Sequence, residues 1–72
     1  MKREYKLPEV VYKLLDEHKM TQQQLADEIH YGQNTIFSWL RTGRMPNLEA
    51  VMLMAAIFNV SIDYLVYGEE RN

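Results

Sequence analysis

Cysteine is absent from the sequence, and its absence excludes several kinds of site at once. Without cysteine the chain has no disulfide framework, no cysteine-ligated zinc and no thiol nucleophile. The two histidines, His18 and His30, are too few for a histidine-rich metal centre. We therefore expect neither a metal ion nor a cofactor to take part in the function of this protein.

Long hydrophobic runs are absent as well. The longest apolar run covers residues 50–58, whereas a membrane-spanning helix needs about 20 apolar residues. No apolar stretch of the secretory type follows the charged residues 1–6. A glycine-rich phosphate loop and a nucleophile elbow are also missing. We therefore expect a cytoplasmic protein that is not an enzyme, with no membrane partner and no evident small-molecule ligand.

The chain is short, and its 72 residues allow one domain and no second. Apolar residues make up 47% of it, which is ordinary for a soluble globular protein and too high for a disordered one. A chain of this size buries only about 60% of the surface that it exposes when unfolded. We therefore expect a folding stability of roughly 3–5 kcal/mol.

Acidic residues are missing from one stretch of the chain, although the net charge is −2. Residues 29–48 contain Arg41 and Arg44 and no aspartate or glutamate, whereas all ten acidic residues lie in the two flanking stretches. A surface that faces phosphate must be poor in carboxylates. Residues 29–48 are therefore the candidate for contact with nucleic acid.

Apolar spacing and capping residues predict an all-α chain. The predicted helices cover residues 8–18, 22–29, 33–41, 48–58 and 62–67. Pro8 suits the first turn of a helix, where a missing N–H costs nothing. Thr21 and Gln24 have the spacing of a capping box, and Asn47 and Ser61 occupy predicted N-cap positions. The sequence thus predicts a compact bundle of five short helices.

The second and third predicted helices are separated by three residues, the spacing of a helix-turn-helix. In that unit the second helix enters the major groove and presents its N-terminal side chains to base edges. In the helix predicted at 33–41, Ile36, Trp39 and Leu40 form the buried face. The opposite face carries Asn34, Phe37, Ser38 and Arg41, with Gln33 at its N-terminal edge.

This pattern resembles the Cro/cI-type, or XRE, family of phage-repressor-like DNA-binding domains. The similarity runs from Thr-Gln-Gln-Gln-Leu-Ala at 21–26 through Ile36 and Trp39, then through Pro-Asn-Leu-Glu at 46–49 to Val-Ser-Ile-Asp-Tyr-Leu at 60–65. It covers about residues 7–68 of a single domain and leaves 69–72 as a polar tail. The resemblance implies a lambda-repressor-like five-helix fold. It also implies a transcriptional regulator, most often a repressor, that binds a palindromic operator on double-stranded DNA as a homodimer.

The resemblance implies a special backbone conformation at His30. The family usually has glycine at this first residue of the turn, where the φ angle is positive. Histidine tolerates positive φ better than most residues that carry a side chain. We therefore expect His30 to be left-handed.

Four residues of the third predicted helix are expected to contact bases: Gln33, Asn34, Phe37 and Ser38. The amides of Gln33 and Asn34 can donate and accept at once, as adenine N6 and N7 require. Ser38 can pair with several bases, and Phe37 can pack on a thymine methyl group. Phe37 could instead be a core residue of a slightly rotated helix, or a protein-contact residue.

Four further residues are expected to contact phosphate: Gln22, Arg41, Arg44 and Asn47. Gln22 matches a family position that contacts phosphate and supports the first residue of the reading helix. The other three lie at the end of that helix and beyond it, where backbone contacts are made. The two arginines could instead be no more than solvated charges.

A dimer interface is predicted on helix 48–58, helix 62–67 and the tail. The core face of helix 48–58 is predicted to hold Leu48, Val51, Ala55 and Phe58, yet its other side is also apolar. An exposed apolar patch usually marks an interface. The predicted interface residues are Met52, Leu53, Ala56, Tyr64, Val66 and Tyr67. Some of these could instead complete the core.

A protein-interaction module on the same fold is the alternative function. Such a module would bind a partner regulator or act like an antitoxin, with little or no DNA binding of its own. The acid-free stretch 29–48 argues against this as the sole role. A shift of DNA by the purified protein distinguishes the two functions.

Overall fold

The computed structural model describes residues 3–69, and within this range the chain forms helices and no strand. The helices are α1 (Leu7–Glu17), α2 (Gln22–Ile29), α3 (Gln33–Thr42), α4 (Leu48–Phe58) and α5 (Ile62–Tyr67). The five-helix all-α fold is thus confirmed, and every helix boundary lies within one residue of its prediction. Residues 70–72 of the predicted polar tail lie outside the described residues.

Hydrogen bonds from side chains fix where three of the helices begin. Thr21 Oγ1 accepts from the N–H of Gln24 at 3.0 Å, and Gln24 Oε1 accepts from the N–H of Thr21 at 2.8 Å. The capping box is therefore confirmed. Asn47 and Ser61 likewise accept from backbone N–H groups in the first turns of α4 and α5. Each cap satisfies a backbone N–H group that has no partner within its helix.

His30 ends α2 in the left-handed conformation, with φ 62° and ψ 39°. The expected positive φ is confirmed. The N–H groups of His30 and Tyr31 donate to the carbonyls of Asp27 and Ala26, at 3.3 and 3.0 Å. The turn therefore changes the direction of the chain sharply between α2 and α3, and it does so with a residue that has a Cβ.

Replacing His30 with glycine is expected to stabilise the fold by about 0.5–1 kcal/mol. A left-handed residue with a Cβ costs roughly 1–2 kcal/mol, and relief of that strain outweighs the about 0.4–1 kcal/mol that glycine adds in unfolded-chain entropy. Urea denaturation measures the change, with His30→Ala as the control because alanine keeps the strain. A neutral or destabilising effect of His30→Gly would contradict the explanation by strain.

The core is formed by apolar side chains from all five helices. Ile36, Trp39 and Leu40 of α3 are buried, as the apolar spacing predicted. The largest fully buried side chains are Leu7, Val11, Leu25, Ile29, Ile36, Met54 and Leu65. The inner face of α3 is thus fixed by packing, which directs its other face outward.

The buried face of α4 differs from its prediction. Leu48 is 68% exposed, whereas Ala50 is fully buried. Val51, Ala55 and Phe58 are buried as expected. The error arises because α4 is apolar nearly all the way round, so hydrophobic spacing cannot select its inner side. None of the helices in residues 3–69, α4 included, combines the length and apolarity that crossing a membrane requires.

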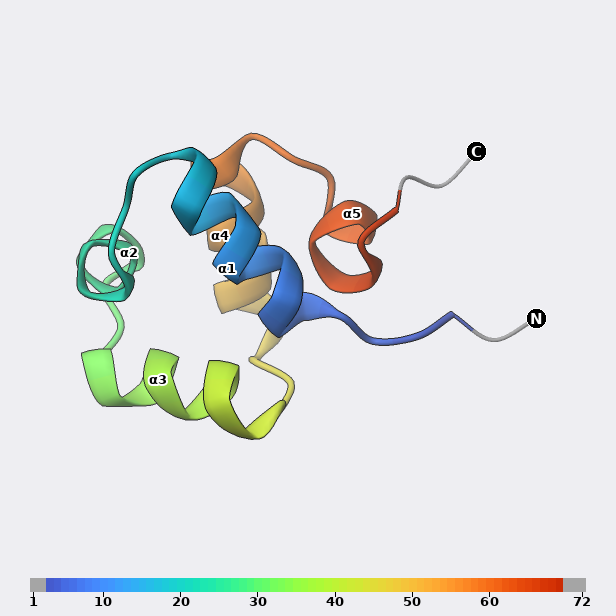
Figure 1. The fold of residues 1–72 in the computed structure, drawn as a ribbon. Coiled ribbons are helices and arrows are strands. Elements are labelled where there is room, and N and C mark those ends of the chain that lie inside the picture. The colour runs from blue at the N-terminus through green and yellow to red at the C-terminus, as the bar shows by residue number, and fades with distance from the viewer. Residues whose placement is uncertain (1–2, 70–72) are drawn as a thin grey trace.

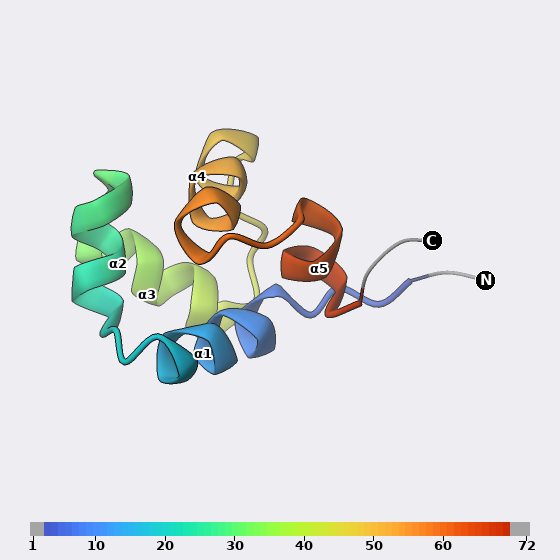
Figure 2. The same cartoon turned by 90° about the horizontal axis from the view of Figure 1, so that it is seen from above.

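The arrangement of the helices leaves α3 on one edge of the molecule (Figure 1). In that view α3 lies lengthwise and α2 is seen end-on beside its first turn, with α1 and α4 on the inner side. Seen from above, α2 lies lengthwise at the end of the molecule away from α5 (Figure 2). The helix-turn-helix pair is thus separate from α5.

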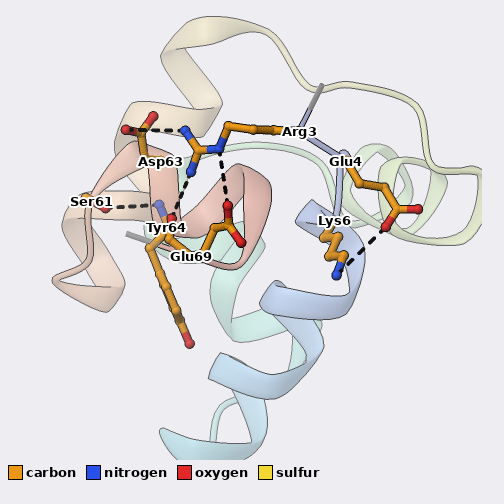
Figure 3. A network of polar contacts seen from close by, with 7 residues as sticks. All are labelled: Arg3, Glu4, Lys6, Ser61, Asp63, Tyr64 and Glu69. Atoms are coloured by element: carbon orange, nitrogen blue, oxygen red, sulfur yellow. Dashed lines mark hydrogen bonds and ion pairs between the residues drawn. The ribbon is translucent and has the colours of Figure 1, made fainter. Parts of the chain in front are cut away.

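The N-terminal segment is attached to α5 (Figure 3). Arg3 forms ion pairs with Asp63 at 3.7 Å and Glu69 at 3.6 Å, and its guanidinium carbon lies 4.2 Å from the ring centre of Tyr67. The N–H of Lys6 donates to the carbonyl of Val66 at 2.7 Å. These contacts hold the short helix α5 against the segment that precedes α1.

Candidate nucleic-acid interface

Helices α2 and α3 and the three-residue turn between them form a helix-turn-helix unit (Figures 1 and 2). The buried residues of α2 are Leu25, Ala26 and Ile29, and α3 packs against this helix with its own apolar side. Packing of both helices fixes the direction of α3 relative to the rest of the domain. The unit can therefore present the outer side of α3 as a rigid surface.

The outer side of α3 carries the residues that the sequence assigned to DNA. Gln33, Asn34 and Arg41 are exposed, and Phe37 and Ser38 are half-buried. Phe37 does not belong to the buried core cluster. Because the helix repeats every 3.6 residues, burial of one side directs these five side chains to the other.

A shallow groove runs between α1, the start of α2 and the side of α3. It is lined by Tyr12, Thr21, Gln22, Gln23, Gln33, Phe37 and Arg41. The structure thus brings Gln22 next to Gln33, Phe37 and Arg41, although these residues are far apart in sequence. Amide and guanidinium donors beside an aromatic ring suit a nucleic acid, which offers phosphate oxygens and apolar base groups.

Tyr12 and Gln23 belong to this groove, but the sequence analysis did not identify them. Tyr12 is 45% exposed on α1, and it lines the groove together with Thr21 and Gln22 at the start of α2. The available signal was that Tyr12 is an aromatic residue outside the apolar stripe of its helix. Its assignment to the groove required knowing how α1 crosses the unit.

The predicted phosphate residues Arg44 and Asn47 lie outside the groove, in and after the loop that follows α3. Thr42 donates its hydroxyl to the carbonyl of Ser38 at 2.6 Å and accepts from the N–H of Arg44 at 3.3 Å. Helix α3 ends at Thr42, one residue later than predicted, where the N–H of Gly43 donates to the carbonyl of Trp39 at 3.1 Å. The bond from the N–H of Arg44 to Thr42 fixes the backbone from which the Arg44 side chain extends.

The charges of Arg41 and Arg44 have no acidic partner in the described part of the chain. Ion pairs within residues 3–69 involve Arg3 and Lys6 instead. Both arginines are exposed. Their guanidinium groups are therefore accessible to a phosphate without first breaking an ion pair.

Besides its predicted N-cap bond, Asn47 makes a contact with Tyr31 that the sequence did not reveal. Its Oδ1 accepts from the N–H of Ala50 at 2.9 Å and from the hydroxyl of Tyr31 at 3.2 Å. The same hydroxyl lies 2.8 Å from Glu49 Oε1. The hydrogen bond to Glu49 raises the pKa of the Tyr31 hydroxyl above its ordinary value.

The predicted dimer residues do not all lie on the surface. Met52, Leu53 and Ala56 are exposed, and Tyr64 and Tyr67 are half-buried. Val66 is a correction, because it is only 7% exposed and belongs to the core. Helix α1 packs against α5, and the N–H of Lys6 donates to the carbonyl of Val66. Val66 therefore cannot contribute much apolar surface to an interface.

The exposed apolar surface also extends beyond the predicted residues. Met45 is 54% exposed and Ile62 is 42% exposed, and both line a groove with Leu48 and Tyr67. We call the exposed apolar residues of this region the outer α4 patch: Met45, Leu48, Met52, Leu53 and Ile62. The i, i+4 spacing of Leu48 and Met52 was the sequence signal for its extent.

Comparisons with known proteins agree with this geometry. The family model described as helix-turn-helix matches residues 11–65. The HTH-type transcriptional activator BcrR of Enterococcus faecalis is 35% identical over 51 residues, which are 71% of this chain and 25% of BcrR. The uncharacterized HTH-type transcriptional regulator YobD of Bacillus subtilis (strain 168) is 29% identical over 49 residues, 68% of this chain and 44% of YobD.

A solved structure is similar over nearly the whole chain. The crystal structure of a transcriptional regulator from Listeria innocua superimposes with a TM-score of 0.81 at 25% sequence identity, covering 96% of this chain and 64% of that one. The chain spans less than half the length of each of the two curated relatives. The shared part contains the helix-turn-helix unit, residues 22–42.

Proposed function

The chain belongs to the XRE-type helix-turn-helix family of DNA-binding transcriptional regulators, and we propose that it represses transcription by binding a palindromic operator as a homodimer. In this proposal α3 enters the major groove, and Gln33, Asn34, Phe37 and Ser38 contact bases. Gln22, Arg41, Arg44 and Asn47 contact the phosphates on either side. The operator is double-stranded DNA, and two copies of the chain bind it together.

The observation that supports this proposal best is the outer face of α3. Two exposed amides begin the helix, and two exposed arginines, which have no acidic partner within residues 3–69, follow at its end and in the next loop. Amides can read adenine, whereas guanidinium groups bind phosphate. Both lie in the acid-free stretch 29–48, as a surface next to DNA requires.

Selection from a random pool of DNA duplexes tests the function directly. We expect the purified protein to enrich one sequence made of two inverted half-sites about 10 base pairs apart, centre to centre, because two recognition helices must meet one face of the duplex. Modest salt is needed, since a protein of net charge −2 gains little non-specific affinity. A pool without enrichment would contradict the proposal and favour the protein-interaction alternative.

The direction of regulation needs a separate measurement. Resemblance to phage repressors favours repression, whereas one relative, BcrR, is named an activator. Repression requires only that bound protein excludes the polymerase from a promoter. With the selected site placed over the promoter of a reporter gene, we expect expression to fall when the protein is supplied. A rise would show activation.

The outer α4 patch is proposed to form the dimer together with Ala56, Tyr64 and Tyr67. We expect Leu53→Glu to shift the protein toward monomer in analytical ultracentrifugation, because the charge would be buried in an apolar contact. The same variant should bind a two-half-site duplex more weakly. Gln24→Glu is the control, since it adds the same charge on α2 and keeps the capping box. A wild type that stays monomeric at high micromolar concentration, with Leu53→Glu unchanged, would disprove this interface.

A further inference from the structure

We propose that Tyr31 is a positioning residue for phosphate contact: its hydroxyl sets the orientation of the Asn47 amide and holds the Glu49 carboxylate away from the DNA backbone. The inference rests on the proposed DNA-binding function and deepens it. Tyr31 lies in the turn between α2 and α3, and it was not among the residues that the sequence assigned to DNA.

The ring of Tyr31 is held in place by the reading helix itself. Its centre lies 5.5 Å from that of the Trp39 ring, and Tyr31 is half-buried against the core. The backbone N–H of Tyr31 donates to the carbonyl of Ala26 in α2. Because both its backbone and its ring are fixed, the hydroxyl has a defined position relative to α3. That position is beside the N-terminus of α4.

The amide of Asn47 is oriented by two hydrogen bonds on one atom. Oδ1 accepts from the N–H of Ala50 at 2.9 Å and from the hydroxyl of Tyr31 at 3.2 Å. A carbonyl oxygen has two lone pairs and can accept both bonds, while the single proton of the Tyr31 hydroxyl is shared between Asn47 Oδ1 and Glu49 Oε1 in a bifurcated hydrogen bond. The nitrogen Nδ2 lies on the other side of the planar amide and has only donors. Phosphate oxygens are acceptors, so this orientation suits phosphate contact.

Glu49 is the acidic residue closest in sequence to Asn47, the proposed phosphate contact. It lies two residues after Asn47, is exposed, and is the first acidic residue beyond the acid-free stretch. Its Oε1 lies 2.8 Å from the hydroxyl of Tyr31. Without this hydrogen bond the flexible carboxylate could turn toward the phosphate and repel it. The hydroxyl therefore acts on two neighbours that affect the same phosphate.

Tyr31→Phe tests the inference because it keeps the ring on Trp39 and removes only the hydroxyl. We expect affinity for the selected operator to fall about three- to tenfold, the range of a lost hydrogen-bond network of this kind. Affinity for unrelated duplexes should fall by the same factor, and the selected sequence should not change, because phosphate contacts carry no base preference.

A second variant separates positioning from general loss of structure. Glu49→Gln should increase DNA affinity more in the Tyr31→Phe background than in the wild type, because only there is the carboxylate released. If Tyr31→Phe bound DNA as tightly as the wild type, or if Glu49→Gln had equal effects in both backgrounds, the inference about Tyr31 would be overturned. The proposed DNA-binding function would be unaffected by either result. If the wild-type protein enriches no duplex, the DNA-binding function fails, and the inference fails with it.

Discussion

Alanine in place of Gln33 or Asn34 is expected to weaken binding to the selected operator by about 1–3 kcal/mol and to relax the base preference at one position of each half-site. Both side chains are exposed in the first turn of α3. Their amides can form paired hydrogen bonds with adenine, and alanine leaves the base edge without a partner. Repeating the selection with each variant measures the loss of preference directly.

Arg41 and Arg44 are expected to behave differently from Gln33 and Asn34, because they are proposed to contact phosphate rather than bases. Arg41→Ala and Arg44→Ala should weaken binding to all duplexes alike and lower the slope of log affinity against log salt by about 1 each. Fluorescence anisotropy at several salt concentrations measures both quantities. If Gln33→Ala and Asn34→Ala left the selected sequence unchanged while Arg44→Ala altered it, α3 would not be the reading element.

Trp39→Ala is expected to unfold most of the protein, whereas Phe37→Ala should leave it folded. The Trp39 side chain is only 8% exposed and belongs to the core. Truncating such a residue costs about 3–5 kcal/mol, which matches the roughly 3–5 kcal/mol available to a domain of this size. Phe37 lies two residues earlier on the same helix, but it is half-buried beside the groove. Its loss should cost about 1 kcal/mol of stability.

The two aromatic variants also separate the two interpretations of Phe37. We expect Phe37→Ala to keep its helical circular dichroism and to lose affinity mainly where the operator offers a thymine methyl group. Thermal unfolding and anisotropy measure the two effects. Equal destabilisation by Phe37→Ala and Trp39→Ala would show that Phe37 is a core residue, and its role in base contact would be withdrawn.

Local chemistry alone was enough to predict the helices and their ends. A capping box, an N-cap asparagine and a serine act within one helical turn, so Thr21, Asn47 and Ser61 identify helix starts before any packing is known. The family pattern also predicted the left-handed His30. The buried face of α3 followed from the spacing of Ile36, Trp39 and Leu40, because its other residues are polar or lie off that stripe.

Tertiary packing decided what spacing left ambiguous. Helix α4 is apolar on nearly every side, so the spacing of its residues did not indicate which side is buried. Packing against the neighbouring helices buries Ala50 and leaves Leu48 exposed. Val66 is part of the core, because α5 packs against α1, a helix that is distant from it in the sequence. Which residues of α4 and α5 are buried depends on helices that are distant in the sequence. The periodicity within one helix carries no information about those contacts.

The candidate site was likewise predictable from the sequence only in part. The sequence identified the α3 residues proposed to face DNA, because one buried stripe fixes the opposite face of a helix and the resemblance to the Cro/cI-type family assigns that face to DNA. The groove that joins Tyr12 and Gln22 to α3, and the hydroxyl of Tyr31 shared between Asn47 and Glu49, required the fold. These contacts link side chains from different helices at distances set by how the helices cross, and the crossing is determined by the core as a whole.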